Sequence, residues 1–328
     1  MKSLNEDLKT GNFRQVYLLY GEEDYLKKQY KDRFVKAMVP EGDTMNYSYF
    51  EGKKTSVAEV TDLAETMPFL AEKRLIVLED TGFFKTASPE LADYLKEMPE
   101  TTCMIFVERE VDKRGKLYKA VKNKGRIVEL DRQDEKTLVR WITGKAKQEG
   151  KQMTESVARF LISWSGLDME QLSRELEKLF SYTMGRQEIT VGDIREICTL
   201  QLTSQIFAMV DAVAEGKQKE ALDYYYSLLT LKEPPMRILS LLCREFRLLM
   251  EVKEMERLGY GRKDIASRCG INPYFLGKYQ AQAKRFQKEE LRQIVEAGVQ
   301  TEENFKMGRM GDVLSVELFL IECSRAGR

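Results

Sequence analysis

The chain of 328 residues contains no histidine. This absence excludes the zinc sites, catalytic triads and acid–base schemes that depend on an imidazole. Cysteine is scarce, and the positions lie too far apart for a CxxC metal or redox motif: Cys103, Cys198, Cys243, Cys269 and Cys323. An odd number of scattered cysteines, with no apolar signal core near Met1, is typical of the reducing cytosol. We therefore expect a cytoplasmic protein without metal or other cofactor.

The chain also lacks an excess of charge of either sign. Lys and Arg together number 53, and Asp and Glu together also number 53. No overall field therefore recruits nucleic acid or a membrane surface, and any basic surface must be local. The longest apolar runs are far too short to span a bilayer. The length predicts two or three domains, and 43% hydrophobic with 32% charged residues is typical of a helix-rich globular protein.

Short apolar segments alternate with helical patterns in residues 1–140. One helix is expected to begin with a capping box, in which Ser56 is followed three places later by Glu59. Another begins at Ser88-Pro89-Glu90. This alternation predicts a parallel sheet covered by helices on both faces. The expected strands are 16–20, 47–50, 75–78, 104–107 and 126–130.

The turn after the first predicted strand is where such a domain would hold a nucleotide. A working loop reads G-x-x-x-x-G-K-[ST], whereas this chain has Gly21-Glu22-Glu23-Asp24-Tyr25-Leu26-Lys27-Lys28. Leu26 replaces the second glycine, Lys28 replaces the hydroxyl that holds Mg²⁺, and three carboxylates line the turn. Glu79-Asp80 stands where a Walker-B pair is expected. Because the required parts are replaced, we predict that this domain does not hydrolyse ATP.

Residues 67–80 combine a short connection with a buried strand. Pro68 limits the preceding helix, because the residue before a proline is disfavoured in the helical region. Phe69 and Leu70 then follow in a loop. Connections run over the surface, so these side chains are either a projecting wedge for a partner or a cap on the core.

A second candidate surface is basic. Lys116, Lys119 and Lys122 recur at helical spacing within residues 112–126. They form either a solvated helix face or a sequence-independent contact with a phosphate backbone, which would be sensitive to salt.

No strand is predicted after Leu130. Residues 141–202 predict a small helical unit, and residues 203–328 an all-helical domain with a long helix that starts at Pro234-Pro235. Residues 264–272 look like the front of a helix-turn-helix, but the apolar Pro273–Leu276 follows where base-contacting residues would be needed. Ser267-Arg268-Cys269 matches a short arginine-finger motif but lies in the all-helical part.

The whole chain resembles the delta-subunit family of the bacterial DNA polymerase III clamp loader, a branch of the AAA+ ATPases. The resemblance is carried by residues 16–26, 67–80, 112–125 and 166–179. It implies an AAA+-like five-stranded parallel sheet domain (1–140), a small helical lid domain (141–202) and an all-helical collar domain for oligomerisation (203–328).

The resemblance also implies a function. Family members do not bind ATP, and they open the ring-shaped sliding clamp by inserting two adjacent apolar side chains, commonly Leu-Phe. Phe69 matches the aromatic position, and Pro68 stands where leucine is usual, so Pro68 and Leu70 are both candidates for the second contact, beside Met67. The implied partners are the sliding clamp (beta subunit), the tau/gamma ATPase subunits, the delta-prime subunit and DNA within the assembled complex, with no membrane.

Two other functions stay open on the residues alone. Lys27 is compatible with an active nucleoside-triphosphatase that has a variant loop, and nucleotide binding by the isolated chain would reveal it. Residues 264–280 are compatible with a helix-turn-helix regulator, which would bind DNA selectively without any clamp.

Overall fold

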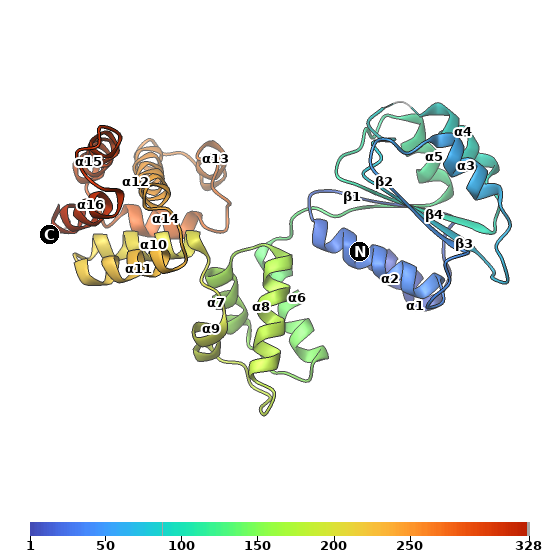
Figure 1. Cartoon of the computed structure of the whole chain (residues 1–328), viewed down its shortest axis with the longest axis horizontal. Coiled ribbons are helices and arrows are strands. Elements are labelled where there is room, and N and C mark those ends of the chain that lie inside the picture. Colours follow the sequence, from blue (N-terminus) through green and yellow to red (C-terminus); the bar gives the residue numbers. More distant parts are fainter. Residues whose placement is uncertain (87, 327–328) are drawn as a thin grey trace. The chain divides into compact units, whose positions relative to one another are not determined.

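The computed structural model describes residues 1–86 and 88–326. The chain forms two compact units, Met1–Gln133 and Asp134–Arg328 (Figure 1). The finer division with boundaries at residues 140 and 202 stays a prediction.

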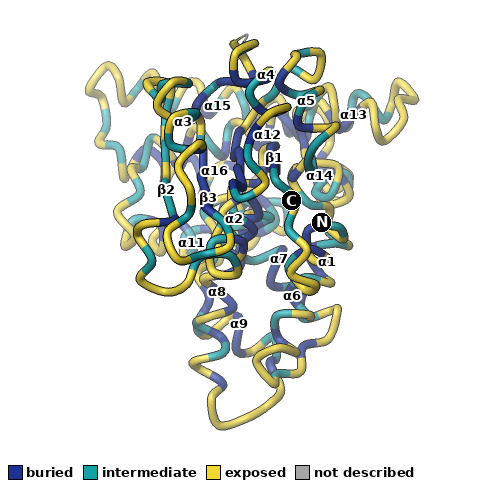
Figure 2. The backbone as a smooth tube through the Cα atoms, turned by 90° about the vertical axis from the view of Figure 1, so that its right-hand side faces the viewer, coloured by how far each residue is buried: buried dark blue, intermediate teal, exposed yellow. Residues whose placement is uncertain are grey.

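The first unit is built on a five-stranded parallel sheet with the strand order β2-β3-β4-β1-β5. All five predicted strands are confirmed. The apolar runs in the middle of the sheet are fully covered, as expected for strands buried on both faces. Figure 2 shows the same burial along the central strands, with exposure concentrated in the connections. The strands are β1 (Val16–Tyr20), β2 (Tyr47–Glu51), β3 (Arg74–Glu79), β4 (Thr102–Glu108) and β5 (Arg126–Glu129).

Helices cover both faces of this sheet (Figure 1). Alternate strand residues such as Leu18, Ile76 and Phe106 enter the core beneath α3, α4 and α5. On the other face Tyr17 packs against Phe34 of α2, with ring centroids 4.5 Å apart. The helices are α1 (Lys2–Thr10), α2 (Asp24–Met38), α3 (Val57–Glu65), α4 (Pro89–Glu97) and α5 (Lys116–Lys124).

Two details of this unit differ from the predictions. Ser56 is the N-cap of α3, but within the described part of the chain its side chain accepts no capping hydrogen bond, so the predicted capping box is wrong. The helix α1 was not predicted, because its apolar face consists of little more than Leu4. It is anchored by polar contacts instead: Asp7 accepts hydrogen bonds from the Tyr17 hydroxyl at 3.0 Å and from Arg126 at 2.8 Å.

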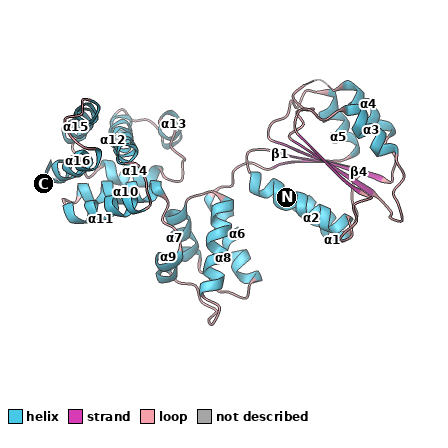
Figure 3. Ribbon diagram, in the orientation of Figure 1, coloured by secondary structure: helices cyan, strands magenta, loops and turns pink. Residues whose placement is uncertain are grey.

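The second unit contains only helices among its described residues, apart from an isolated bridge between Gln152 and Glu188 (Figure 3). Three helices of this unit have N-caps, Thr154, Asp168 and Thr190, whose side chains accept a backbone N–H. The first helices of the unit are α6 (Glu135–Gln148), α7 (Glu155–Ser165), α8 (Met169–Tyr182) and α9 (Val191–Ile197).

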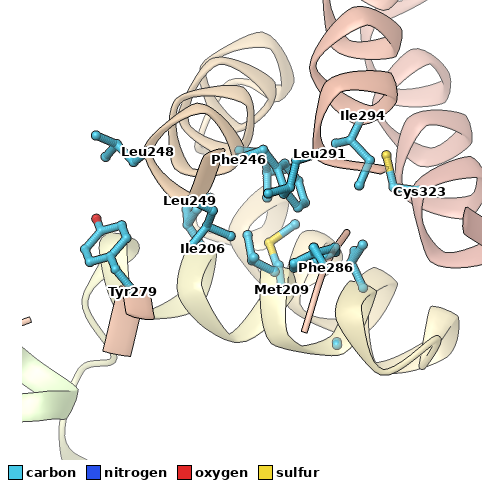
Figure 4. Close-up of a cluster of buried hydrophobic side chains, with 14 of the residues drawn as sticks. Ile206, Met209, Phe246, Leu248, Leu249, Tyr279, Phe286, Leu291, Ile294 and Cys323 are labelled. Carbon is cyan, nitrogen blue, oxygen red and sulfur yellow. The ribbon is translucent and has the colours of Figure 1, made fainter. Parts of the chain in front are cut away.

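The remaining helices enclose an extensive apolar cluster (Figure 4). Phe246 of the long α12 meets Phe286 edge to face, with ring centroids 5.8 Å apart. The helices are α10 (Leu202–Ala214), α11 (Gln218–Thr230), α12 (Pro235–Arg257), α13 (Arg262–Arg268), α14 (Leu276–Ala283), α15 (Lys288–Lys306) and α16 (Asp312–Ala326). In the described residues no single helix has the length and apolar character to cross a membrane; only α9 and α10 together, bent by 109°, meet such a test of length and composition.

Candidate functional site

The connection between α3 and β3 presents large apolar side chains to solvent. Met67 is 71% exposed, Phe69 59% and Leu70 93%, whereas Pro68 is half-buried. Phe69 and Leu70 therefore do not cap the core, which was one of the two arrangements compatible with the sequence. We call residues 67–70 the apolar corner.

The apolar corner is tied down at both ends. The helix α3 ends at Glu65, and Thr66 has an extended backbone. The helix thus stops before Met67, the residue that Pro68 disfavours in the helical region. Arg74, at the start of β3, is buried, and its Nε donates to the Thr66 carbonyl at 3.1 Å. This bond holds the end of the helix next to the start of the strand, so the residues between them must bulge outward.

The backbone of Phe69 is held by a side chain from another loop. The Asn46 side chain accepts a hydrogen bond from the Phe69 N–H at 2.7 Å and donates one to the Phe69 carbonyl at 2.8 Å. The same Asn46 amide nitrogen donates to Asp43 at 2.7 Å. Sequence reasoning did not find Asn46, since 23 residues separate it from Phe69.

Leu70 has an unusual backbone conformation for its residue type. Its φ is +51°, in the left-handed region that glycine and asparagine favour. That conformation costs a leucine about 1–2 kcal/mol, and a side chain that is 93% exposed recovers little through packing. Met45, which precedes Asn46 in the chain, is a further exposed apolar side chain, and no periodic pattern predicted it.

The glycine of the nucleotide-like turn is required by the protein's own backbone. Gly21 has a φ of +127°, and a Cβ at this position would lie 2.4 Å from the Leu130 carbonyl oxygen. The next residues of the turn continue this contact, because the Glu23 N–H donates to the same oxygen at 2.9 Å. Gly21 is thus explained without a bound phosphate.

The lysine of this turn is committed to neighbouring groups. The Lys27 side chain is only 6% exposed, and its Nζ forms an ion pair with Asp24 at 2.8 Å. It also donates to the Glu108 carbonyl at 3.3 Å. Leu26 is buried, and Lys28 points to solvent. The ion pair with Asp24 thus neutralises Lys27, the residue whose charge made the turn compatible with a triphosphate.

The glutamate of the Walker-B-like pair is also engaged elsewhere. Glu79 accepts a hydrogen bond from the Tyr49 hydroxyl at 2.8 Å and forms an ion pair with Lys31. At the end of β4, burial raises the pKa of Glu108, whose carboxylate accepts from the Thr81 hydroxyl at 2.7 Å. Across the described ranges no three carboxylate or cysteine side chains are grouped so that they could hold a metal ion.

The predicted basic surface lies on α5. Lys116, Lys119 and Lys122 are exposed. None of the three forms an ion pair within 4.0 Å with any residue that the structure describes, whereas Lys113 nearby pairs with Glu129 at 2.9 Å. The three side chains are therefore available to an external anion.

The segment that resembles a helix-turn-helix and the segment that resembles an arginine finger both have structural roles in the second unit. Both α13 and α14 pack against α12, and Leu276 and Tyr279 of α14 are buried in the core. A helix that reads DNA would need these positions free. The Arg268 guanidinium lies 4.7 Å from the centroid of the Tyr260 ring, as in a cation–π contact.

Comparison with known proteins gives matches along most of the chain. The family described as "DNA polymerase III, delta subunit" matches residues 17–131, and "DNA polymerase III delta subunit, C-terminal domain" matches residues 203–323. The Bacillus subtilis DNA polymerase III subunit delta is 29% identical over 97% of this chain and 95% of its own length. The Escherichia coli DNA polymerase III subunit delta is 23% identical over 76% of this chain and 73% of its own length.

A solved structure is similar over the same extent. The Bacillus subtilis DNA clamp loader delta protein superposes with a TM-score of 0.72 and 28% identity, and the match covers 99% of both chains.

Proposed function

The chain belongs to the family of DNA polymerase III delta subunits, which places it in the clamp loader, and from this premise we propose that it binds and opens the sliding clamp without hydrolysing ATP itself. The observation that carries the proposal is the apolar corner, where Phe69 and Leu70 are held in solvent. Such side chains gain free energy when a partner covers them.

Opening the clamp would then be a shift between two states of the ring. If the corner binds the open ring more tightly than the closed ring, its binding energy favours opening. The energy of ATP hydrolysis would come from other subunits. The pairing of Lys27 with Asp24 and the packing of Gly21 against Leu130 support this division of labour.

The proposed partners follow from the assembly to which the family belongs. They are the sliding clamp (beta subunit), the tau/gamma ATPase subunits, delta-prime, and primed DNA within the assembled loader in the cytoplasm. We assign clamp binding to residues 1–140, a lid to 141–202 and assembly into a collar to 203–328. The isolated chain carries no catalytic site in this account.

The isolated chain is expected to bind no MgATP. The turn at Gly21 is filled by the Leu130 backbone, and Lys27 is already paired. Isothermal titration of MgATP into the purified chain should give no binding heat, with an ATPase subunit of the same loader as the positive control. Micromolar binding to the delta subunit alone would overturn this part of the proposal.

The basic face of α5 is expected to contribute to DNA binding by the loader. Changing Lys116, Lys119 and Lys122 together to Glu removes three candidate phosphate contacts, and each contact contributes about 0.9 to the slope of log K against log salt concentration. The loader's affinity for primed DNA should fall, and the slope should flatten by up to roughly 3.

A matched triple variant separates local contacts from net charge. Lys36, Lys53 and Lys54 are exposed on the same unit, and changing them to Glu alters the total charge equally. This control should keep the wild-type slope. An unchanged slope in the α5 variant would mean that these lysines do not contact DNA and only face solvent.

A further inference from the structure

We propose that Asn46 is a positioning residue of the clamp-binding site, which holds Phe69 in the conformation that the clamp accepts. This inference rests on the proposed function of the apolar corner. It assigns a role to a side chain that lies outside the corner and precedes β2.

The geometry of the contact is specific. Asn46 is 3% exposed, and one amide group satisfies both the N–H and the carbonyl of Phe69, at 2.7 and 2.8 Å. Among the described residues these are the only hydrogen bonds made by residues 67–72. The conformation of the corner between its two ends therefore depends on this side chain.

Asp43 fixes which way the Asn46 amide points. The Asn46 nitrogen donates to Asp43 at 2.7 Å, so the oxygen must face the Phe69 N–H. Asp43 also accepts from the backbone N–H groups of Met45 and Asn46, at 2.9 and 3.0 Å. These bonds hold the pKa of Asp43 below its ordinary value.

The hydrogen bonds from Asn46 to the Phe69 backbone would raise the affinity for the clamp by ordering the apolar corner before binding. A loop that must be ordered at the moment of binding loses part of its interaction energy to conformational entropy. Asparagine supplies one donor and one acceptor side by side, which matches a backbone carbonyl and N–H of one residue. Alanine at position 46 would leave both Phe69 groups without a partner and free the corner to move.

The test compares full-length variants in a titration with the host's sliding clamp. Asn46→Ala should bind roughly tenfold more weakly than wild type. The loss caused by Asn46→Ala should be much smaller in the Phe69→Ala background than in wild type, because Asn46 acts mainly through Phe69. In the free protein, hydrogen exchange at the Phe69 amide should speed up in Asn46→Ala.

Two further variants control for folding. Thr81→Val removes a different buried hydrogen bond, to Glu108, and should leave clamp affinity unchanged even if it lowers the melting temperature. If Asn46→Ala does not fold, Asp43→Ala removes the orienting partner instead and should weaken binding roughly threefold.

The outcomes separate this inference from the function on which it rests. Wild-type affinity in a folded Asn46→Ala or Asp43→Ala variant, beside weak binding by Phe69→Ala, would overturn the inference alone. An Asn46→Ala effect that is as large in the Phe69→Ala background as in wild type would also overturn it, since Asn46 would then act independently of Phe69. If Phe69→Ala binds like wild type, or wild type does not bind at all, the proposed function fails and the inference fails with it.

Discussion

Phe69→Ala should weaken binding of the isolated chain to the sliding clamp by roughly 30-fold or more. A projecting aromatic side chain that enters an apolar pocket is a typical interface hot spot, worth about 2 kcal/mol or more on truncation. Each tenfold change in affinity corresponds to about 1.4 kcal/mol. The measurement is a titration of clamp against wild type and variant, with Tyr182→Ala, another exposed aromatic position, as the matched control.

The stability of the same variant separates a binding residue from a core residue. Phe69 is 59% exposed, so its replacement should leave the melting temperature nearly unchanged. Phe106 is fully buried, and Phe106→Ala should cost about 3–5 kcal/mol. A sharp drop in melting temperature for Phe69→Ala, with clamp affinity retained by the folded fraction, would place the contact elsewhere.

The neighbours of Phe69 decide which side chain completes the contact. Leu70 is 93% exposed and Pro68 is half-buried. We therefore expect Leu70→Ala to reduce clamp affinity more than Pro68→Ala, with Met67→Ala as a further comparison. The reverse order would assign the second contact to Pro68.

Leu314→Asp combined with Leu318→Asp should block incorporation of the chain into the loader, with assembly weakened by at least roughly 30-fold. The reason lies in α16, which has apolar side chains in solvent as well as in the core. Val316 and Phe319 enter the core, yet Leu314 is 50% exposed and Leu318 37% exposed, one helical turn apart. Exposed apolar side chains on one helix face gain free energy when a partner covers them, so we expect neighbouring subunits to cover this face.

The control for this prediction carries the same added charge at other exposed leucines. Leu231 and Leu258 are 58% and 57% exposed and follow α11 and α12. Size-exclusion chromatography of reconstituted loader should show the control double variant in the complex and the α16 variant outside it. Normal incorporation of the α16 variant would mean that this face is not part of the collar contact.

The strands could be predicted from the sequence because their signal is local. Leu75 to Leu78 form an unbroken apolar run that only a buried strand or helix can accommodate, and the flanking charges limit its length. Pro68 and the loop position were compatible with two arrangements of Phe69, exposed to solvent or packed on the core. Choosing between them required the path of the backbone between α3 and β3.

The contacts that hold the site could not be predicted, because they join distant parts of the chain. Nothing in the residues near Asn46 indicates that its amide meets Phe69. The pairing of Lys27 with Asp24 is local in sequence, three residues apart, but it depends on the rotamers that the two side chains adopt. The predicted capping box failed for a similar reason: Ser56 is the N-cap, but its side chain makes no capping hydrogen bond. Residue spacing shows where such bonds can form, and the packing of the side chains determines whether they do form.

The most direct test of the account is the binding of the purified chain to its host's sliding clamp in the absence of nucleotide and of other loader subunits. The apolar corner is already exposed in the isolated chain, so the account predicts a stable complex that is unaffected by added MgATP and lost on replacement of Phe69. Failure of the wild-type chain to bind the clamp, or binding only when MgATP is present, would contradict it.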